Sequence, residues 1–248
     1  MIHFLRMSTT ALFSTLASPS PYSNNLSGLS TLRSFHSTVS VFPLRSSCND
    51  DEYGNDQSMN KNNPVEVVTL RKATVSDAPL LRKWDEQEYL QDASGDDDDW
   101  DYENEFARTD NDSWAVYLVA EIGQDDDDKQ KRRPIGFVQI IDPKEEETHY
   151  WGDDCEANLR AIDIWIGDER CLGRGYGTQM MDQALSDYCF DSDQVRAVLV
   201  DPLLSNTRAH KFYQKLGFRP VGKRTFGSDE CLVHRLDRAD WFRSTTRT

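Results

Sequence analysis

The stretch of sequence that decides the fold is Ile162-Asp163-Ile164-Trp165-Ile166, followed after a short gap by Leu172-Gly173-Arg174-Gly175-Tyr176-Gly177-Thr178. The first part has the apolar run of a buried strand, and the second is a glycine-rich turn that leads into a helix predicted over residues 175–190. Glycines at alternate positions remove Cβ atoms where backbone N–H groups would approach an anion, and a helix N-terminus favours negative charge. This order predicts a phosphate-binding loop.

The spacing of the glycines separates this loop from two common nucleotide-binding loops. The dinucleotide fingerprint reads G-x-G-x-x-G, whereas residues 173–177 read G-x-G-x-G. The loop also lacks the lysine that a P-loop requires. A glycine-rich surface turn is the alternative that the loop alone leaves open.

A second strand, loop and helix follow the first. Residues 197–200 form a short apolar run, Asp201-Pro202 ends it, and a helical pattern begins at Asn206. Asn206 is placed to cap this helix, and Gly217 suits the left-handed position that ends it. One apolar face has helical spacing; it consists of Ala209, Phe212, Tyr213 and Leu216.

At these residues the chain resembles the GNAT superfamily of acetyl-CoA-dependent N-acetyltransferases. Its second motif is matched by Ser205, Asn206, Ala209, Tyr213, Gly217 and Phe218. Arg160-Ala161-Ile162-Asp163, the glycine loop and Asp201-Pro202 look like the aminoglycoside 6′-N-acetyltransferase branch, as do Trp151 and Asp153-Asp154. The resemblance covers residues 65–241. Leu172 stands where the superfamily usually has Gln or Arg, a difference that this branch tolerates.

The resemblance implies an α/β fold, with a mixed central sheet of about six to seven strands flanked by about four helices. It also implies a site for acetyl-CoA. Strand residues Ile164, Trp165 and Ile166 would contact the pantetheine arm and supply an oxyanion N–H. The pyrophosphate would lie on the loop residues Leu172, Gly173, Arg174, Gly175, Tyr176, Gly177 and Thr178, with Asn206 at the pantetheine end.

The resemblance assigns the remaining site residues to the acceptor amine and to proton transfer. Asp163 is the candidate base or substrate anchor, and Tyr213 the candidate acid for the departing thiolate. Trp151, Asp153, Asp154 and Asp201 are the candidate substrate-binding residues. Structural interpretations stay open for each: an exposed strand carboxylate for Asp163, a turn residue for Asp201, and core positions for Tyr213 and Trp151.

The first 60 residues differ in composition from the rest. The first 48 contain three arginines, no acidic residue and many Ser and Thr, which is typical of an organelle transit peptide. We therefore expect a disordered N-terminal region over residues 1–60, a domain over residues 65–241 and a tail over residues 242–248. A mitochondrial or other organellar location is expected. The alternative is a cytoplasmic protein whose Ser-rich N-terminus carries no targeting signal.

The acidic balance of the chain bears on its partners. The formal net charge is −15 although the first 48 residues are basic, which argues against nucleic acid or anionic membranes and suits a small cationic amine. The runs Asp96 to Asp99 and Asp125 to Asp128 are interpreted as solvated loops. Scattered cysteines and histidines predict no metal site, with Cys171 a plain small residue, and no pattern indicates an oligomeric state.

A coarse reading of periodicity completes the predicted elements. Strands are expected at residues 65–70, 114–121, 135–141, 161–166, 197–200, 218–221 and 231–236. Further helices are expected at residues 77–89, capped by Ser76, and at residues 100–107. The segments 114–121 and 135–141 are predicted to pair as an antiparallel hairpin.

Together these observations predict an enzyme that acetylates a primary amine of a small polycation, aminoglycoside-like or polyamine, by direct transfer in a ternary complex. Two alternatives remain from this reading. One is an acetyltransferase acting on a hydroxylated amine, a lysine or a protein amine, and the other is a non-catalytic acetyl-CoA-binding module.

Overall fold

The structure is a computed structural model, and it describes residues 66–94, 100–108, 114–123 and 132–245. Within these ranges the strands are β1 (Val67–Lys72), β2 (Ala115–Gly123), β3 (Arg133–Ile141), β4 (Leu159–Ile166), β5 (Ala197–Val200), β6 (Arg219–Phe226) and β7 (Asp229–Asp237). The α-helices are α1 (Ala78–Asp85), α2 (Glu88–Ser94), α3 (Tyr102–Arg108), α4 (Tyr176–Gln183), α5 (Thr207–Lys215) and α6 (Arg238–Thr245). The predicted transit peptide and the two aspartate runs lie outside the described residues.

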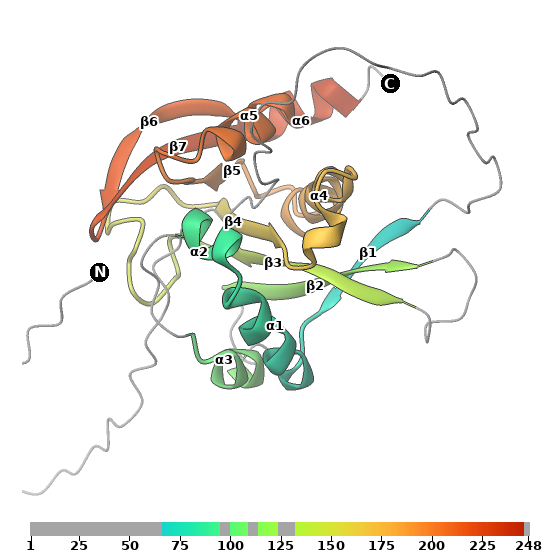
Figure 1. Cartoon of the computed structure of the whole chain (residues 1–248). Coiled ribbons are helices and arrows are strands. Elements are labelled where there is room, and N and C mark those ends of the chain that lie inside the picture. The colour runs from blue at the N-terminus through green and yellow to red at the C-terminus, as the bar shows by residue number, and fades with distance from the viewer. Residues whose placement is uncertain (1–65, 95–99, 109–113, 124–131, 246–248) are drawn as a thin grey trace, which may run out of the picture.

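The strands form one mixed sheet in the order β1-β2-β3-β4-β5-β7-β6 (Figure 1). All neighbouring strands pair antiparallel except β4 and β5, which pair parallel. The predicted hairpin is confirmed, because β2 and β3 pair antiparallel from Ala115↔Ile141 to Ile122↔Arg133. This is the α/β fold that the sequence predicts, with more helices than expected.

The two faces of the sheet bury separate cores. Even-numbered residues of β4, such as Ile164, pack with Met180 and Met181 of α4 and with Tyr213 of α5. Odd-numbered residues, such as Trp165, pack on the opposite face in a core that α1, α2 and α3 cover. Figure 1 shows α4 and α5 on one side of the strands and α1 and α3 on the other. Since side chains alternate along a strand, β4 contributes to both layers.

The sheet opens in its middle, between β4 and β5. Their parallel pairing begins at Leu159↔Ala197 and ends at Ala161↔Leu199, although β4 continues to Ile166. Beyond this point β3 pairs with the second half of β4, and no described strand pairs with its other edge. Asp163 and Asp201 both lie just past the last pair, on either side of the opening.

Several predicted elements differ from the observed ones. The helix expected over residues 77–89 is divided into α1 and α2, since the Gln87 side chain donates to the Trp84 carbonyl at 3.0 Å where the helix breaks. Ser76 is not its cap: a 3-10 turn, Val75–Asp77, precedes α1, and Asp77 accepts from the Thr74 N–H at 2.8 Å.

The helix expected over residues 175–190 starts one residue later than predicted and is not uniform. Gly175 is its N-cap, with α4 beginning at Tyr176, and its last part, Ala184–Cys189, is a π-helix. The two closing strands, β6 and β7, are longer than predicted. For β6 the reason is that it is exposed over almost its whole length and therefore carries no apolar alternation. No described helix is long and apolar enough to span a membrane.

Candidate active site

The glycine loop connects β4 to α4 and has the backbone conformation that its sequence predicts. Gly173 and Gly175 have φ values of 75° and 83°, in the left-handed region that glycine adopts without strain. A Cβ built on Gly175 meets no atom within 4 Å, so open space borders the backbone there. Inside α4 there is no acceptor for the N–H groups of Gly175, Tyr176 and Gly177, which lie at the start of the helix. These groups can bind an anion.

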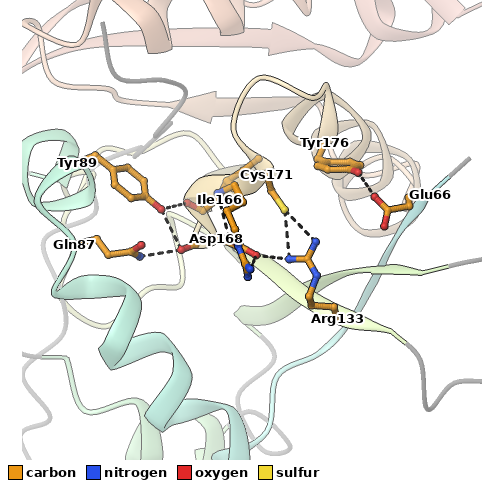
Figure 2. A network of polar contacts seen from close by, with 10 residues as sticks. Glu66, Gln87, Tyr89, Arg133, Ile166, Asp168, Cys171 and Tyr176 are labelled. Atoms are coloured by element: carbon orange, nitrogen blue, oxygen red, sulfur yellow. Dashed lines mark hydrogen bonds and ion pairs between the residues drawn. The ribbon is translucent and has the colours of Figure 1, made fainter. Parts of the chain in front are cut away.

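A polar network holds the loop from below (Figure 2). Arg133 donates to the Asp168 carboxylate, and its guanidinium nitrogens lie 3.5 and 3.6 Å from the Cys171 Sγ. The Tyr176 hydroxyl donates to the Glu66 carboxylate, which ties the start of α4 to the chain beside β1. Burial raises the pKa of the Cys171 thiol, although Arg133 opposes the shift. Cys171 is fully buried, as a structural rather than a reactive thiol would be.

Helix α2 holds the end of the strand that leads into the loop. The Tyr89 hydroxyl donates to the carbonyls of Ile166 and Gly167, each at 3.0 Å, and the Gln87 Nε2 donates to the Gly167 carbonyl at 2.8 Å (Figure 2). A Cβ on Gly167 would lie 1.9 Å from the Trp84 ring, so only glycine fits between this strand end and α1.

Asn206 and Tyr213 lie on α5, on the same face of the sheet as α4. The Asn206 Oδ1 accepts from the Ala209 N–H at 3.1 Å, which is the predicted N-cap. Its Nδ2 is buried and makes no hydrogen bond with any described residue, so one amide donor is available for a ligand carbonyl. Tyr213 is fully buried, and its ring packs against Phe218.

Asp163 and Asp201 are buried carboxylates, with 7% and 2% of their surfaces exposed. The Tyr150 hydroxyl donates to the Asp201 Oδ2 at 2.8 Å. Burial and the adjacent Asp201 carboxylate raise the pKa of the Tyr150 hydroxyl, and the charges of Cys231 and Asp163 act in the same direction. The two carboxylates and this phenol therefore form one electrostatic cluster, beside the opening between β4 and β5.

Aromatic rings border this cluster. Tyr150 stacks on Phe226 with centroids 4.2 Å apart, and Trp151 packs edge-on against both rings. Trp151 is 1% exposed, so it belongs to the wall rather than to the surface. The carbonyl of Trp151 accepts from the Arg224 guanidinium at 2.9 Å, which anchors this loop to β6.

Three buried N–H donors make no hydrogen bond with any residue that the structure describes. They are Gln139 Nε2, Trp151 Nε1 and Trp165 Nε1. Gln139 pairs directly with Asp163 across β3 and β4, and Trp165 follows Asp163 by two residues. The side chains of Gln139, Asp163 and Trp165 therefore share one face of the sheet. The sequence did not indicate Gln139, which stands in an apolar run, or Tyr150, which stands beside Trp151. Only the strand register could have shown that Gln139 belongs to the site.

Asp153 and Asp154 lie elsewhere in the predicted acceptor region, on an exposed turn. The Asp153 side chain is 93% exposed and lies 3.4 Å from the His149 Nδ1. The structure thus brings together Asp163, Asp201 and the Trp151 wall, and leaves this acidic pair at the solvent boundary. Within the described ranges, no three His, Cys, Asp or Glu side chains are grouped as metal ligands.

Comparisons with known proteins agree with this geometry. The acetyltransferase (GNAT) domain model matches residues 73–226. An aminoglycoside N(6′)-acetyltransferase type 1 from Serratia marcescens is 27% identical over 189 residues, which cover 75% of this chain and 90% of that protein. A protein of the same name from Klebsiella pneumoniae is 27% identical over 167 residues, which cover 66% of this chain and 79% of that protein.

Solved structures show the same fold. The aminoglycoside acetyltransferase AAC(6′)-Ib in complex with coenzyme A has a TM-score of 0.60 at 23% identity, covering 73% of this chain and 99% of that one. A chimera of the spermidine N-acetyltransferase SpeG from Vibrio cholerae and hSSAT has a TM-score of 0.52 at 17% identity, covering 71% of this chain and 99% of that one. With the loop, the opened sheet and the buried motif residues in place, the chain belongs to the GNAT family of acetyltransferases.

Proposed function

We propose that this protein transfers the acetyl group of acetyl-CoA to a primary amine of a small polycationic acceptor, by direct transfer in a ternary complex. The observation that carries the proposal is the pair of buried carboxylates, Asp163 and Asp201, at the opening between β4 and β5. A carboxylate on each side of the opening can form an ion pair with one ammonium group. An acceptor with two ammonium groups would therefore match both.

The free N–H donors beside the carboxylates refine the acceptor class. Gln139, Trp151 and Trp165 each offer a buried donor that no described residue uses. Leaving such donors unmatched costs free energy, so the occupant of the site is expected to bring oxygen acceptors. A polyamine has none, whereas an amino sugar has hydroxyl and ether oxygens. We therefore favour a hydroxylated polycation of the aminoglycoside-like kind over a bare polyamine.

The residues on the other side of the opening fit acetyl-CoA. The N–H groups at the start of α4 suit a pyrophosphate, and the open space at Gly175 lets the anion approach the backbone. The unused Nδ2 of Asn206 suits a pantetheine carbonyl, and the edge of β4 beyond its last pair with β5 suits the pantetheine amides. The thioester would then end beside the carboxylate cluster.

The proton movements follow from what amide formation requires. An alkylammonium is protonated near neutral pH, so a proton must leave the amine before it attacks the thioester carbonyl. Asp163 would take or direct that proton, directly or through a water. When the carbon–sulfur bond breaks, Tyr213 would donate its hydroxyl proton to the thiolate. A backbone N–H of β4 would stabilise the charge that develops on the carbonyl oxygen.

The test is release of free thiol from acetyl-CoA by the full chain, with kanamycin, spermidine, lysine, hydroxylysine and a short lysine peptide offered in parallel. Turnover with kanamycin well above that with spermidine is the expected result. Equal or faster turnover with spermidine would agree with a polycationic acceptor but contradict the preference for a hydroxylated one. Turnover with the peptide alone would overturn the small-acceptor proposal.

Binding of acetyl-CoA without turnover on any acceptor would contradict the enzymatic proposal and leave a binding module. This outcome is recognised by calorimetry with coenzyme A, which measures occupancy of the loop independently of chemistry. Tyr213→Phe provides the matched control for the chemical step. It removes one hydroxyl from a buried ring and leaves the loop intact.

A further inference from the structure

Two buried histidines adjoin Tyr213 and have no part in the mechanism above. His210 lies one helical turn before Tyr213 on α5, and His234 lies on β7, opposite Val200 of β5. Their rings stack with centroids 5.1 Å apart and an interplanar angle of 24°. His234 is fully buried and His210 is 9% exposed. Two imidazoles inside an otherwise apolar core need a physical explanation.

The hydrogen bonds of each ring fix which nitrogen carries a proton. His234 Nδ1 lies 2.9 Å from the Leu232 carbonyl, and His210 Nε2 lies 3.3 Å from the Leu204 carbonyl. A carbonyl only accepts, so both of these nitrogens carry the proton. The other nitrogens, His234 Nε2 and His210 Nδ1, are buried acceptors that no described residue uses.

The surroundings keep His234 neutral. Burial lowers the pKa of His234, and the neighbouring His210 lowers it further. A neutral Nε2 with a free lone pair accepts a hydrogen bond and cannot donate one. Because its Nδ1 is turned to the backbone of its own strand, the free Nε2 lies on the far side of the ring, inside the core.

Tyr213 is the hydroxyl-bearing residue whose ring contacts His234. The two ring centroids are 6.2 Å apart at an interplanar angle of 43°. The phenol hydroxyl and Nε2 make no direct hydrogen bond with each other, and at this ring separation one water can join them. A hydrogen bond to the neutral phenol favours its protonated form. That is the form that an acid must have when the thiolate departs.

We infer that His234 is a positioning residue for Tyr213. Its Nε2 accepts a hydrogen bond from a water that in turn accepts from the Tyr213 hydroxyl, and this link holds the phenol protonated and in one orientation. His210 holds the His234 ring in place by stacking. The inference rests on the proposed function, in which Tyr213 donates a proton to the departing thiolate.

The test uses two substitutions that separate the two ring nitrogens. His234→Asn keeps a donor for the Leu232 carbonyl and lacks an acceptor at the Nε2 position. His234→Gln carries an amide oxygen that reaches the Nε2 position. We expect His234→Asn to lower kcat about tenfold, the effect of losing one hydrogen bond. The KM for acetyl-CoA should stay within about twofold, and His234→Gln should recover most of the loss.

A double-mutant cycle with Tyr213→Phe distinguishes positioning from a structural role. If His234 acts through the Tyr213 hydroxyl, His234→Asn costs little more once that hydroxyl is gone. An equal loss in both backgrounds, or no loss in the native background, overturns the inference. Unchanged kcat in Tyr213→Phe alone would instead overturn the acid role of Tyr213, so the two failures differ.

A measurement without any histidine variant covers the case in which His234→Asn does not fold. The nitrogen chemical shift of His234 Nε2, recorded by NMR, reports whether that atom accepts a hydrogen bond. We expect it to move between the native protein and Tyr213→Phe, and the His210 Nε2 shift to remain unchanged. An unmoved His234 Nε2 shift would overturn the inference.

Discussion

Asp163 on β4 and Asp201 directly after β5 occupy the same level, each two residues beyond the last backbone pair of these parallel strands, Ala161↔Leu199. If the pairing continued, the two carboxylates would be neighbours in the sheet. Because β4 and β5 separate first, the two strands leave an opening with one acidic residue on each side. Both charges raise the pKa of the same phenol, that of Tyr150.

Replacing the Asp163 carboxylate should abolish most of the activity. We expect Asp163→Asn to lower kcat/KM for the amine at least about 100-fold, since a positioned acid or base contributes on that order. Binding of acetyl-CoA, measured by calorimetry, should not change. Asp193→Asn is the matched control, because Asp193 is 98% exposed in its ion pair with Arg238. Similar losses in both variants would refute a special role for Asp163.

Two glycines with left-handed backbones separate strain from phosphate binding. Gly175 and Gly217 have φ values of 83° and 94°, and a Cβ on either meets no heavy atom closer than 3.6 Å. Alanine should therefore destabilise the protein by about 1 kcal/mol at each position, through backbone strain. Only Gly175→Ala should also raise the KM for acetyl-CoA. Thermal melts and steady-state kinetics on both variants make the comparison, and an equal rise in KM would exclude the loop.

The two ends of the Asn206 amide should have separable effects. Asn206→Asp keeps the oxygen that accepts from Ala209 and removes the unused donor, whereas Asn206→Ala removes both. We expect both variants to raise the KM for acetyl-CoA. Asn206→Ala alone should also lose about 1 kcal/mol of stability, the value of an N-cap. A normal KM in Asn206→Asp would show that the cap is the whole role of this residue.

The exposed acidic pair should act at long range if it acts at all. Asp153 is 93% exposed, so its charge can attract a cationic acceptor but is screened by salt. Asp153→Asn should raise the KM for the amine by less than about threefold at low ionic strength, and by nothing measurable at high salt. An effect that persists at high salt would place this carboxylate in direct contact with the substrate.

His234 should make the stability of the protein depend on pH in a defined direction. Its pKa in the folded protein lies below the ordinary value of 6.5. Between these two pH values the unfolded chain binds more protons, so stability falls as the pH drops through 6.5 and levels off below the folded pKa. Melting temperatures from about pH 7.5 to about pH 5 should fall more steeply in the native protein than in His234→Asn. Parallel curves would mean that His234 is not buried as neutral imidazole.

Local patterns predicted the parts of the fold that depend on neighbouring residues. The apolar run Ala197–Val200 matches β5 at both ends, and Asn206 caps α5 as its sequence indicates. The break between α1 and α2 was not predictable, since Gln87 ends the helix with its own side chain while binding a strand end far along the sequence.

The parts of the candidate site that the sequence did not reveal depend on distant contacts. Tyr150 bonds to Asp201 across 51 positions, and Gln139 is set opposite Asp163 by strand register. His234 looked like an isolated histidine in a strand, because its stacking partner belongs to a helix. Periodicity shows which side of a strand is buried, but it does not show which buried polar groups converge.

The contact between Tyr89 and the carbonyls of Ile166 and Gly167, where β4 ends, has a consequence for how two substrates would bind. It fastens the helical layer on the acceptor side to the strand end from which the loop on the other side departs. A ligand that orders either layer therefore removes part of the conformational entropy that the second ligand would otherwise have to remove. Occupancy of the acceptor site should therefore strengthen binding at the glycine loop, and the reverse, because the Tyr89 hydrogen bonds connect the two.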